Sequence, residues 1–337
     1  MRKKRIVVVC PGRGSYTRKT SNYLENADSN LRSMIEEQDK IRSTKNLKSV
    51  FELDKAIFRA KTHMSGENAS PLIYSCSLKD YSLINKEKYE IAAICGNSMG
   101  WYIAMALSGA LTNEDGFDLI QTMGILTQDH GTGGQIIYPI IDEDWRININ
   151  RRNMLLDEVS KIGAHLSIKL GGFVVIGGKQ SALNHLLKTL PTIDKYPFQI
   201  PFHAAFHTRL IEKSTSLAQS YFDYKIFNRP RIPLVDGRGN IWSPWSTDIQ
   251  ELFSYTLGDQ IVRPYDFSSS IDVAVKEFCP DQVVLLGPGN SLGSPVAQVL
   301  IENNWNGLNS KSDFLNSQEK DPFVISMGIE EQRNIVL

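Results

Sequence analysis

The sequence lacks a charge imbalance and lacks any long apolar run. Its 337 residues contain 37 Lys and Arg against 37 Asp and Glu, so the formal net charge is zero. A strong field of one sign, of the kind that attracts nucleic acid or an anionic lipid surface, is therefore missing. No apolar stretch approaches the roughly 18 residues of a membrane-spanning helix. We expect neither nucleic acid nor a membrane as partner.

Cysteine is scarce, and the sequence has no nucleotide-binding glycine motif. Four cysteines are scattered along the chain without a C-x-x-C spacing: Cys10, Cys76, Cys95 and Cys279. This pattern is typical of reduced thiols and predicts a cytoplasmic protein with no metal site. The glycine-containing segment 11–16 lacks both the Walker lysine and the G-x-G-x-x-G spacing, which argues against a phosphate-binding loop.

The sequence does contain a Gly-x-Ser-x-Gly motif at Gly96-Asn97-Ser98-Met99-Gly100. The apolar run 89–95 before it predicts a buried strand, and the apolar stretch 100–107 after it predicts a helix. In such a strand–turn–helix the serine adopts a strained conformation, and the flanking glycines leave room for neighbouring backbone and substrate. Its hydroxyl then lies at a helix N-terminus, which favours developing negative charge. This is the arrangement of an acyl-transferring nucleophile.

A serine hydroxyl is a weak nucleophile and requires a nearby base. The chain has six histidines: His63, His130, His165, His185, His203 and His207. The segment 201–210 differs from the surroundings of the other histidines, because it lies where the chain re-enters the large domain. A base there can face Ser98 across a cleft. For His203, four residues before His207, a packing role is the simpler interpretation.

The order of predicted elements indicates an α/β fold with an inserted subdomain. Residues 1–132 and 201–303 alternate helices with buried strands, which predicts an α/β-hydrolase-like body with a parallel sheet. Residues 133–200 follow a βαββαβ order, which is the ferredoxin-like plan. The tail 304–337 is rich in Asn, Ser, Lys and Asp, so we expect a loose C-terminal extension.

Four blocks of the sequence resemble the malonyl-CoA:acyl carrier protein transacylase family, the acyltransferases of fatty-acid and polyketide synthesis, over roughly residues 5–303. In chain order they are Cys10-Pro11-Gly12-Arg13-Gly14-Ser15, Gly96-Asn97-Ser98-Met99-Gly100, Ala205-Phe206-His207 and Leu286-Gly287-Pro288-Gly289. The family has the same body and the same ferredoxin-like insert.

The resemblance implies Ser98 as nucleophile and His207 as base. It also implies that the backbone N–H groups of Arg13 and Met99 hold the oxyanion, and that Asp266 orients His207 through its carbonyl oxygen or its side chain. The reaction would be ping-pong, from an acyl thioester to Ser98 and then to a second thiol. Acyl-CoA or acyl-phosphopantetheine is the implied substrate and an acyl carrier protein the implied partner, with no permanently bound cofactor.

This sequence departs from the family at the acyl pocket, which we assign to Met123, Asn97 and Phe206. Met123 stands where malonyl-using members have the arginine that pairs with the malonyl carboxylate. A carboxylate buried against methionine costs several kcal/mol, which predicts an enzyme that is not selective for malonyl. Two rescues stay open, because Arg13 or, less directly, Lys169 can supply the missing charge.

Two other functions fit the same residues. A hydrolase could clear acyl groups from a carrier protein with the same Ser98–His207 pair, and a carrier-binding scaffold would need no chemistry. The intact pair argues against the scaffold. Carrier proteins are acidic, so basic residues near the cleft are candidates for docking: Arg151, Arg152, Lys161 and Lys179.

Overall fold

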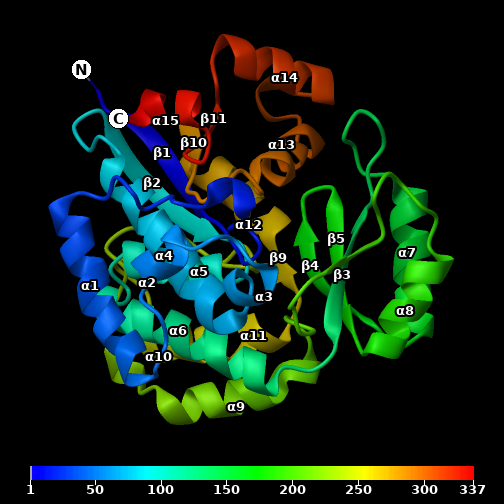
Figure 1. Ribbon diagram of the computed structural model, residues 1–337. Coiled ribbons are helices and arrows are strands. Elements are labelled where there is room, and N and C mark those ends of the chain that lie inside the picture. The colour runs from blue at the N-terminus through cyan, green and yellow to red at the C-terminus, as the bar shows by residue number, and fades with distance from the viewer. Residues whose placement is uncertain (1) are drawn as a thin grey trace.

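The computed structural model describes residues 2–337, and its centre is a six-stranded sheet in the order β11-β10-β1-β2-β7-β8. All neighbouring pairs are parallel except β7 and β8. The strands are β1 (Lys4–Cys10), β2 (Tyr89–Gly96), β7 (Leu234–Val235), β8 (Ile241–Trp242), β10 (Gln282–Leu285) and β11 (Val324–Ser326). Figure 1 shows this sheet running through the body.

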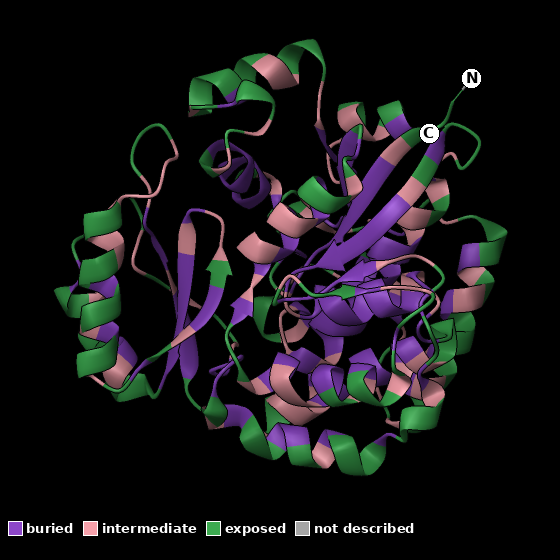
Figure 2. Cartoon of the chain, turned by 180° about the vertical axis from the view of Figure 1, so that it is seen from behind, coloured by how far each residue is buried: buried purple, intermediate pink, exposed green. Residues whose placement is uncertain are grey.

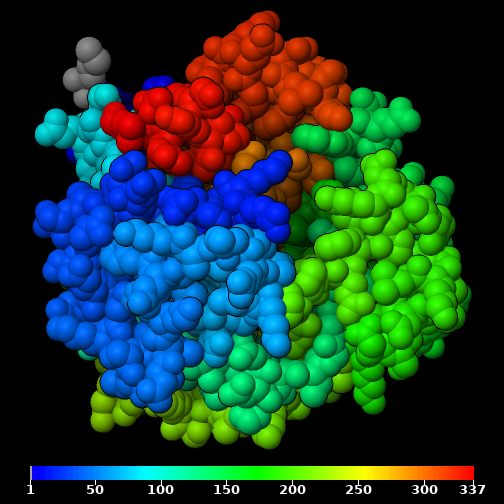
Figure 3. All heavy atoms as spheres, in the orientation of Figure 1, coloured from blue at the N-terminus to red at the C-terminus, as the bar shows by residue number. Residues whose placement is uncertain are grey.

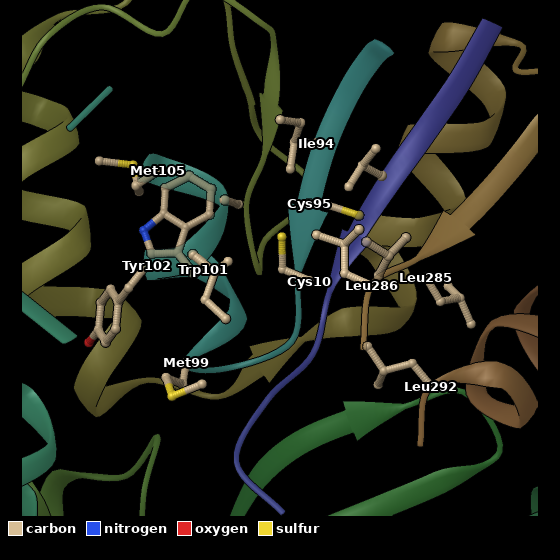
Figure 4. Close-up of a cluster of buried hydrophobic side chains, with 14 of the residues drawn as sticks. Cys10, Ile94, Cys95, Met99, Trp101, Tyr102, Met105, Leu285, Leu286 and Leu292 are labelled. Atoms are coloured by element: carbon tan, nitrogen blue, oxygen red, sulfur yellow. The ribbon is translucent and has the colours of Figure 1, made fainter. Parts of the chain in front are cut away.

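The central strands are continuous apolar runs because helices cover both faces of the sheet. Residues 6–10 of β1 are fully buried, and Figure 2 shows the neighbouring strands buried over most of their length. Helices α4 and α5 cover one face, and α12 and α13 cover the other (Figure 1). Figure 4 shows side chains from β1, β2 and β10 packed together with those at the start of α5. This core fixes the turn that carries Ser98.

The body helices before the subdomain are α1 (Ser29–Thr44), α2 (Val50–Lys55), α3 (Ala60–His63), α4 (Gly66–Leu83), α5 (Gly100–Leu107) and α6 (Asn113–His130). Those after it are α9 (Glu212–Tyr221), α10 (Ile249–Ser254), α11 (Gln260–Val262), α12 (Phe267–Phe278) and α13 (Gly293–Glu302). A π-helical turn, Tyr255–Asp259, joins α10 to α11.

The subdomain has the predicted βαββαβ order. Its elements are β3 (Gly134–Pro139), α7 (Ile149–Lys161), β4 (His165–Leu170), β5 (Phe173–Gly178), α8 (Gln180–Thr189) and β6 (Phe198–Ile200). Its sheet has the order β6-β3-β5-β4 and is extended by β9 (Tyr265–Asp266) of the body, which lies parallel to β4. The predicted fold class is confirmed. The subdomain also has its own core between this sheet and the helices α7 and α8.

The tail 304–337 is part of the body and not the loose extension that its composition suggests. It forms α14 (Lys311–Lys320), strand β11 beside β10, and α15 (Glu330–Val336). The last helix is bonded to the turn before β2, where the N–H of Asn85 donates to the carbonyl of Val336 at 2.9 Å. The strand β11 has only three residues, all of them buried. So short a stretch is not a recognisable strand pattern within a polar segment.

None of the helices in the described part of the chain combines the length and the hydropathy that a bilayer crossing needs. Within the same residues, no three His, Cys, Asp or Glu side chains are grouped so as to hold a metal ion.

Candidate active site

Ser98 lies at a sharp turn between β2 and α5, as predicted. Its φ of 56° is in the left-handed region, which is uncommon for a residue with a side chain. A Cβ on Gly96 would lie 2.3 Å from the backbone of Gly100, and a Cβ on Gly100 would lie 2.3 Å from the carbonyl oxygen of Cys10. Both glycines are therefore required by close backbone contacts, and the turn presents the Ser98 hydroxyl at the N-terminus of α5.

The loop that follows β1 lies directly against this turn. The N–H of Asn97 donates to the carbonyl of Cys10 at 3.0 Å. A Cβ on Gly12 would come within 2.8 Å of the carbonyl oxygen of Asn97, so only glycine permits the approach. The backbone of Arg13 is thereby held next to Ser98, and Arg13 and Met99 both line the pocket at Ser98. Their N–H groups remain the predicted oxyanion donors.

His207 is the base candidate that the fold brings to Ser98. The Nε2 atom of His207 lies 2.7 Å from the Ser98 Oγ, although the two residues are 109 positions apart in the chain. On the other side of the ring, Nδ1 lies 2.7 Å from the main-chain carbonyl oxygen of Gln260. That carbonyl accepts a hydrogen only if Nδ1 carries it, which leaves Nε2 free to accept the serine proton.

The prediction that Asp266 orients His207 is wrong, because the Gln260 carbonyl occupies Nδ1. Asp266 caps the N-terminus of α12, where its carboxylate accepts from the N–H of Ser269 at 2.9 Å, and it forms an ion pair with Lys169 at 2.7 Å. A carbonyl oxygen carries no side-chain signature, so sequence motifs could not identify Gln260. A buried glutamine at the end of the π-helical turn is the one weak signal.

The Gln260 side chain also joins the site. Its Nε2 donates to the main-chain carbonyl of Ser98 at 3.0 Å, and its Oε1 accepts from the Tyr102 hydroxyl at 2.9 Å. Residue 260 therefore bonds to the base through its backbone and to the nucleophile's backbone through its side chain. The three groups form one connected network, which restricts the positions of Ser98 and His207 relative to each other.

Burial lowers the pKa of His207 to about 4, while the hydrogen bond to the Gln260 carbonyl acts in the opposite direction. His207 is only 3% exposed. The ring is consequently neutral at pH 7, which is the state that accepts a proton.

A pocket with an empty volume of about 430 Å³ opens beside Ser98. Apart from Arg13 and His207, its walls are apolar or uncharged: Ser70, Met99, Tyr102, Ile120, Met123, Gly124, Thr127, Phe206, Ile211, Gln260 and Ile261. In the space-filling view the surface is hollowed where the body meets the subdomain (Figure 3). Most of the pocket lining is apolar, with Arg13 as its one cationic side chain among the described residues.

Helix α6 supplies Met123 to this pocket. This helix lies very close to α4. A Cβ added to Gly66 would lie 2.2 Å from the carbonyl oxygen of Gly124, and a Cβ added to Gly124 would lie 2.3 Å from that of Gly66. Met123 is 4% exposed and has no basic neighbour on α6 that lines the pocket. Phe206 lines the pocket as predicted, whereas Asn97 lies against Gly12 and is not a lining residue, so that assignment is wrong.

The two candidate rescues for the missing arginine differ in their position relative to the pocket. Lys169 is paired with Asp266 and does not line the pocket. Arg13 does line it, but one of its terminal nitrogens donates to the carbonyls of Met64 and Phe202 at 3.2 and 3.1 Å. The Arg13 guanidinium thus connects the loop after β1, the first loop, to the segment that leads to His207.

A second polar network holds that segment against the subdomain. His203 Nδ1 lies 2.7 Å from Gln135 Oε1, and Gln135 Nε2 donates to the Ser167 hydroxyl at 2.6 Å. The Ser167 hydroxyl donates in turn to the carbonyl of Phe206 at 2.8 Å. Burial and the positive charge of Arg13 hold the pKa of His203 well below its usual range. His203 therefore acts as a neutral packing residue, as expected.

The basic residues proposed for docking lie on the subdomain and none lines the pocket. Arg151, Arg152 and Lys161 are on α7, and Lys179 precedes α8. Their role with a carrier protein stays a prediction.

Comparison with solved structures supports the fold assignment. The malonyl-CoA:acyl carrier protein transacylase of Synechocystis sp. PCC 6803 superposes with a TM-score of 0.76 at 14% identity, covering 98% of this chain and 99% of that one. The corresponding enzyme of Xanthomonas oryzae pv. oryzae gives 0.77 at 16% identity over 100% and 98%. The chain has the transacylase fold. At this identity the likeness establishes architecture alone.

A malonyl-transacylase solved in complex with its type II polyketide acyl carrier protein has the same fold, with a TM-score of 0.76 at 16% identity over 99% of both chains. By sequence, the polyketide biosynthesis acyltransferase homolog PksD of Bacillus subtilis is 24% identical over 165 residues. That match spans about half of each chain, 49%. No protein-family profile matches the sequence.

Proposed function

We propose that this protein is a Ser–His acyltransferase that moves an acyl group from an acyl thioester to the thiol of an acyl carrier protein. The observation that carries the proposal is the 2.7 Å contact between Ser98 Oγ and His207 Nε2 at the mouth of the pocket. The transacylase fold and the similarity to PksD support it. The carrier protein as acceptor is supported by the solved complex with this fold.

In the first half-reaction Ser98 Oγ attacks the thioester carbonyl while His207 Nε2 takes the serine proton. The resulting oxyanion is held by the N–H groups of Met99 and Arg13. Collapse breaks the carbon–sulfur bond, and the departing thiolate takes the proton from His207. In the second half-reaction His207 deprotonates the carrier thiol, which attacks the ester and releases Ser98.

The acyl group that we propose lacks a terminal carboxylate. Met123 is buried in the pocket wall, and neither Lys169 nor a free guanidinium fork is present to pair with malonate. A carboxylate buried against Met123 without a paired cation is rejected by orders of magnitude.

The test is to incubate the protein with acetyl-CoA, malonyl-CoA and longer acyl-CoA donors and to measure covalent adducts by intact mass. We expect an ester with the neutral donors that Ser98→Ala abolishes and that Ser15→Ala, which removes the serine of the first loop, retains. Addition of carrier protein with its phosphopantetheine arm should transfer the acyl group. Rapid loss to water without transfer would assign hydrolysis to the same pair, and no adduct from any donor would refute both.

A further inference from the structure

Ser98 and His207 share an uncommon backbone conformation. Each has a φ of 56°, in the left-handed region that residues with side chains rarely adopt. Such a conformation is unfavourable by itself and persists only where surrounding contacts hold it. The 2.7 Å distance between Ser98 Oγ and His207 Nε2 therefore depends on the residues that pack around both turns.

The peptide unit that joins Gly96 to Asn97 is bonded at both ends. Its N–H belongs to Asn97 and donates to the Cys10 carbonyl at 3.0 Å. Its carbonyl belongs to Gly96 and accepts from the Tyr265 hydroxyl at 2.5 Å. Because a peptide unit is planar and rigid, bonds on its two opposite sides restrict its rotation. The chain thus enters the Ser98 turn in a fixed orientation.

Tyr265 also contacts the base. Its ring lies against the His207 imidazole, with the two centroids 5.3 Å apart and the planes at 51°. The side chain is only 1% exposed. Burial raises the pKa of Tyr265 well above its usual range, so the phenol keeps its proton and is the donor to Gly96. One side chain therefore contacts both strained turns, the first through its hydroxyl and the second through its ring.

The surroundings of Tyr265 hold its side chain in place. The residue lies in β9, which pairs with β4 of the subdomain opposite Ile168 (Figure 1). The next residue, Asp266, donates its N–H to the carbonyl of Gly237 at 2.7 Å. A Cβ on Gly237 would lie 2.4 Å from the Tyr265 ring, so only glycine leaves space for the ring there. The strand and the glycine together restrict where the Tyr265 side chain can lie.

We propose that Tyr265 is a positioning residue for the Ser98–His207 pair. Its hydroxyl fixes the peptide unit before Asn97, and its ring supports one side of the His207 imidazole, so that the two reacting atoms stay within hydrogen-bond distance. The inference rests on the proposed acylation of Ser98. Tyr265 does not line the pocket. Its loss should therefore slow the chemical step without changing how the donor binds.

Tyr265→Phe tests the hydroxyl, because it keeps the ring against His207. The measurement is single-turnover formation of the Ser98 ester from butyryl-CoA at several donor concentrations, which separates the limiting rate from the half-saturating concentration. Loss of one buried hydrogen bond should lower the limiting rate about three- to tenfold and change the half-saturating concentration by less than about twofold. Tyr265→Leu also removes the ring and should lower the limiting rate further.

Tyr138→Phe is the matched control. Tyr138 is likewise fully buried, and its hydroxyl donates to a main-chain carbonyl, that of Pro191, at 2.8 Å. It belongs to the core of the subdomain and does not line the pocket. Tyr138→Phe should lower the midpoint of thermal unfolding as Tyr265→Phe does, but leave the limiting rate unchanged. The midpoint is recorded for every variant, and Tyr265→Phe decides the test if the leucine variant does not fold.

An unchanged limiting rate in Tyr265→Phe would overturn the inference and leave the proposed function intact. An equal fall in Tyr138→Phe would do the same, because it would show that lost stability alone slows the reaction. A change confined to the half-saturating concentration would also overturn it, since Tyr265 would then act on donor binding. Absence of an ester from every donor with the wild type would instead refute the proposed function itself.

Discussion

The two sides of the pocket differ in how completely their polar groups are bonded. At the catalytic side, Ser98, His207 and Gln260 form a connected set in which each group has a partner. At the acyl side, Met123 offers no polar atom to the substrate's far end, and the Nε of Arg13 has no acceptor. In the proposed function the chemistry thus depends mainly on the turn after β2 and the choice of acyl group on α6, while the first loop belongs to both through the N–H and the guanidinium of Arg13.

The largest effect should come from removing the base. His207→Ala leaves Ser98 without a proton acceptor, so we expect ester formation to fall by about 10²–10⁴. The rate is measured by quenched mass spectrometry with a neutral donor. His203→Ala is the matched comparison, because it removes a neighbouring imidazole that bonds Gln135 and not Ser98. An equal loss in both variants would show that the segment 201–207 matters only as packing.

Met123→Arg should make this pocket prefer malonyl-CoA over a neutral donor. The new guanidinium lies on α6 without the two carbonyl partners that occupy Arg13, so it can pair bidentately with a carboxylate. We expect the malonyl rate relative to butyryl to rise about 10²-fold. Met123→Lys supplies the charge without the fork and should give a smaller rise. If the wild type already prefers malonyl-CoA, Met123 does not prevent the pocket from binding a carboxylate.

Gln260→Ala tests whether the side chain of residue 260 matters as well as its carbonyl. The carbonyl that accepts from His207 remains, but the bonds to the Ser98 backbone and to Tyr102 are lost. Since each neutral hydrogen bond contributes about 0.5–1.5 kcal/mol, we expect kcat to fall by about tenfold with KM little changed. Tyr102→Phe removes one of these bonds and should cost less. A change confined to KM would contradict a positioning role.

The smallest change should appear in the pH profile. The neutral form of His207 is the base, and burial moves its pKa down to about 4. Lowering the pH from 7 to 5 should therefore reduce the acylation rate constant by less than about twofold, whereas an unshifted histidine would lose about 25-fold. The measurement is kcat/KM with butyryl-CoA across this range, with thermal unfolding recorded at each pH. A midpoint near 6.5 would mean that His207 is not buried during the reaction.

The parts of this site that sequence predicts are those with local signals. An apolar run followed by Gly96 and Gly100 indicates the turn at Ser98, because only glycine fits those two backbone contacts. The place of His207 at the domain junction and the resemblance of its block indicate the base. Gln260 carries no such signal, because it bonds to the base through a carbonyl that every residue has. Strand β11 has too weak a signal, since three buried residues do not stand out in a polar tail.

The position of β1 has a consequence for the order in which the chain assembles. This first strand lies between β2 and β10, and β10 is in turn covered at its edge by β11, near the end of the sequence. A Cβ added to Gly328 would lie 2.0 Å from the Gly289 carbonyl oxygen, so the loop beside Ser15 is enclosed by residues that are synthesised much later than Ser15. Contacts of such long sequence separation form slowly. During translation the first loop can be enclosed in this way only after β11 and the residues that follow it have been made.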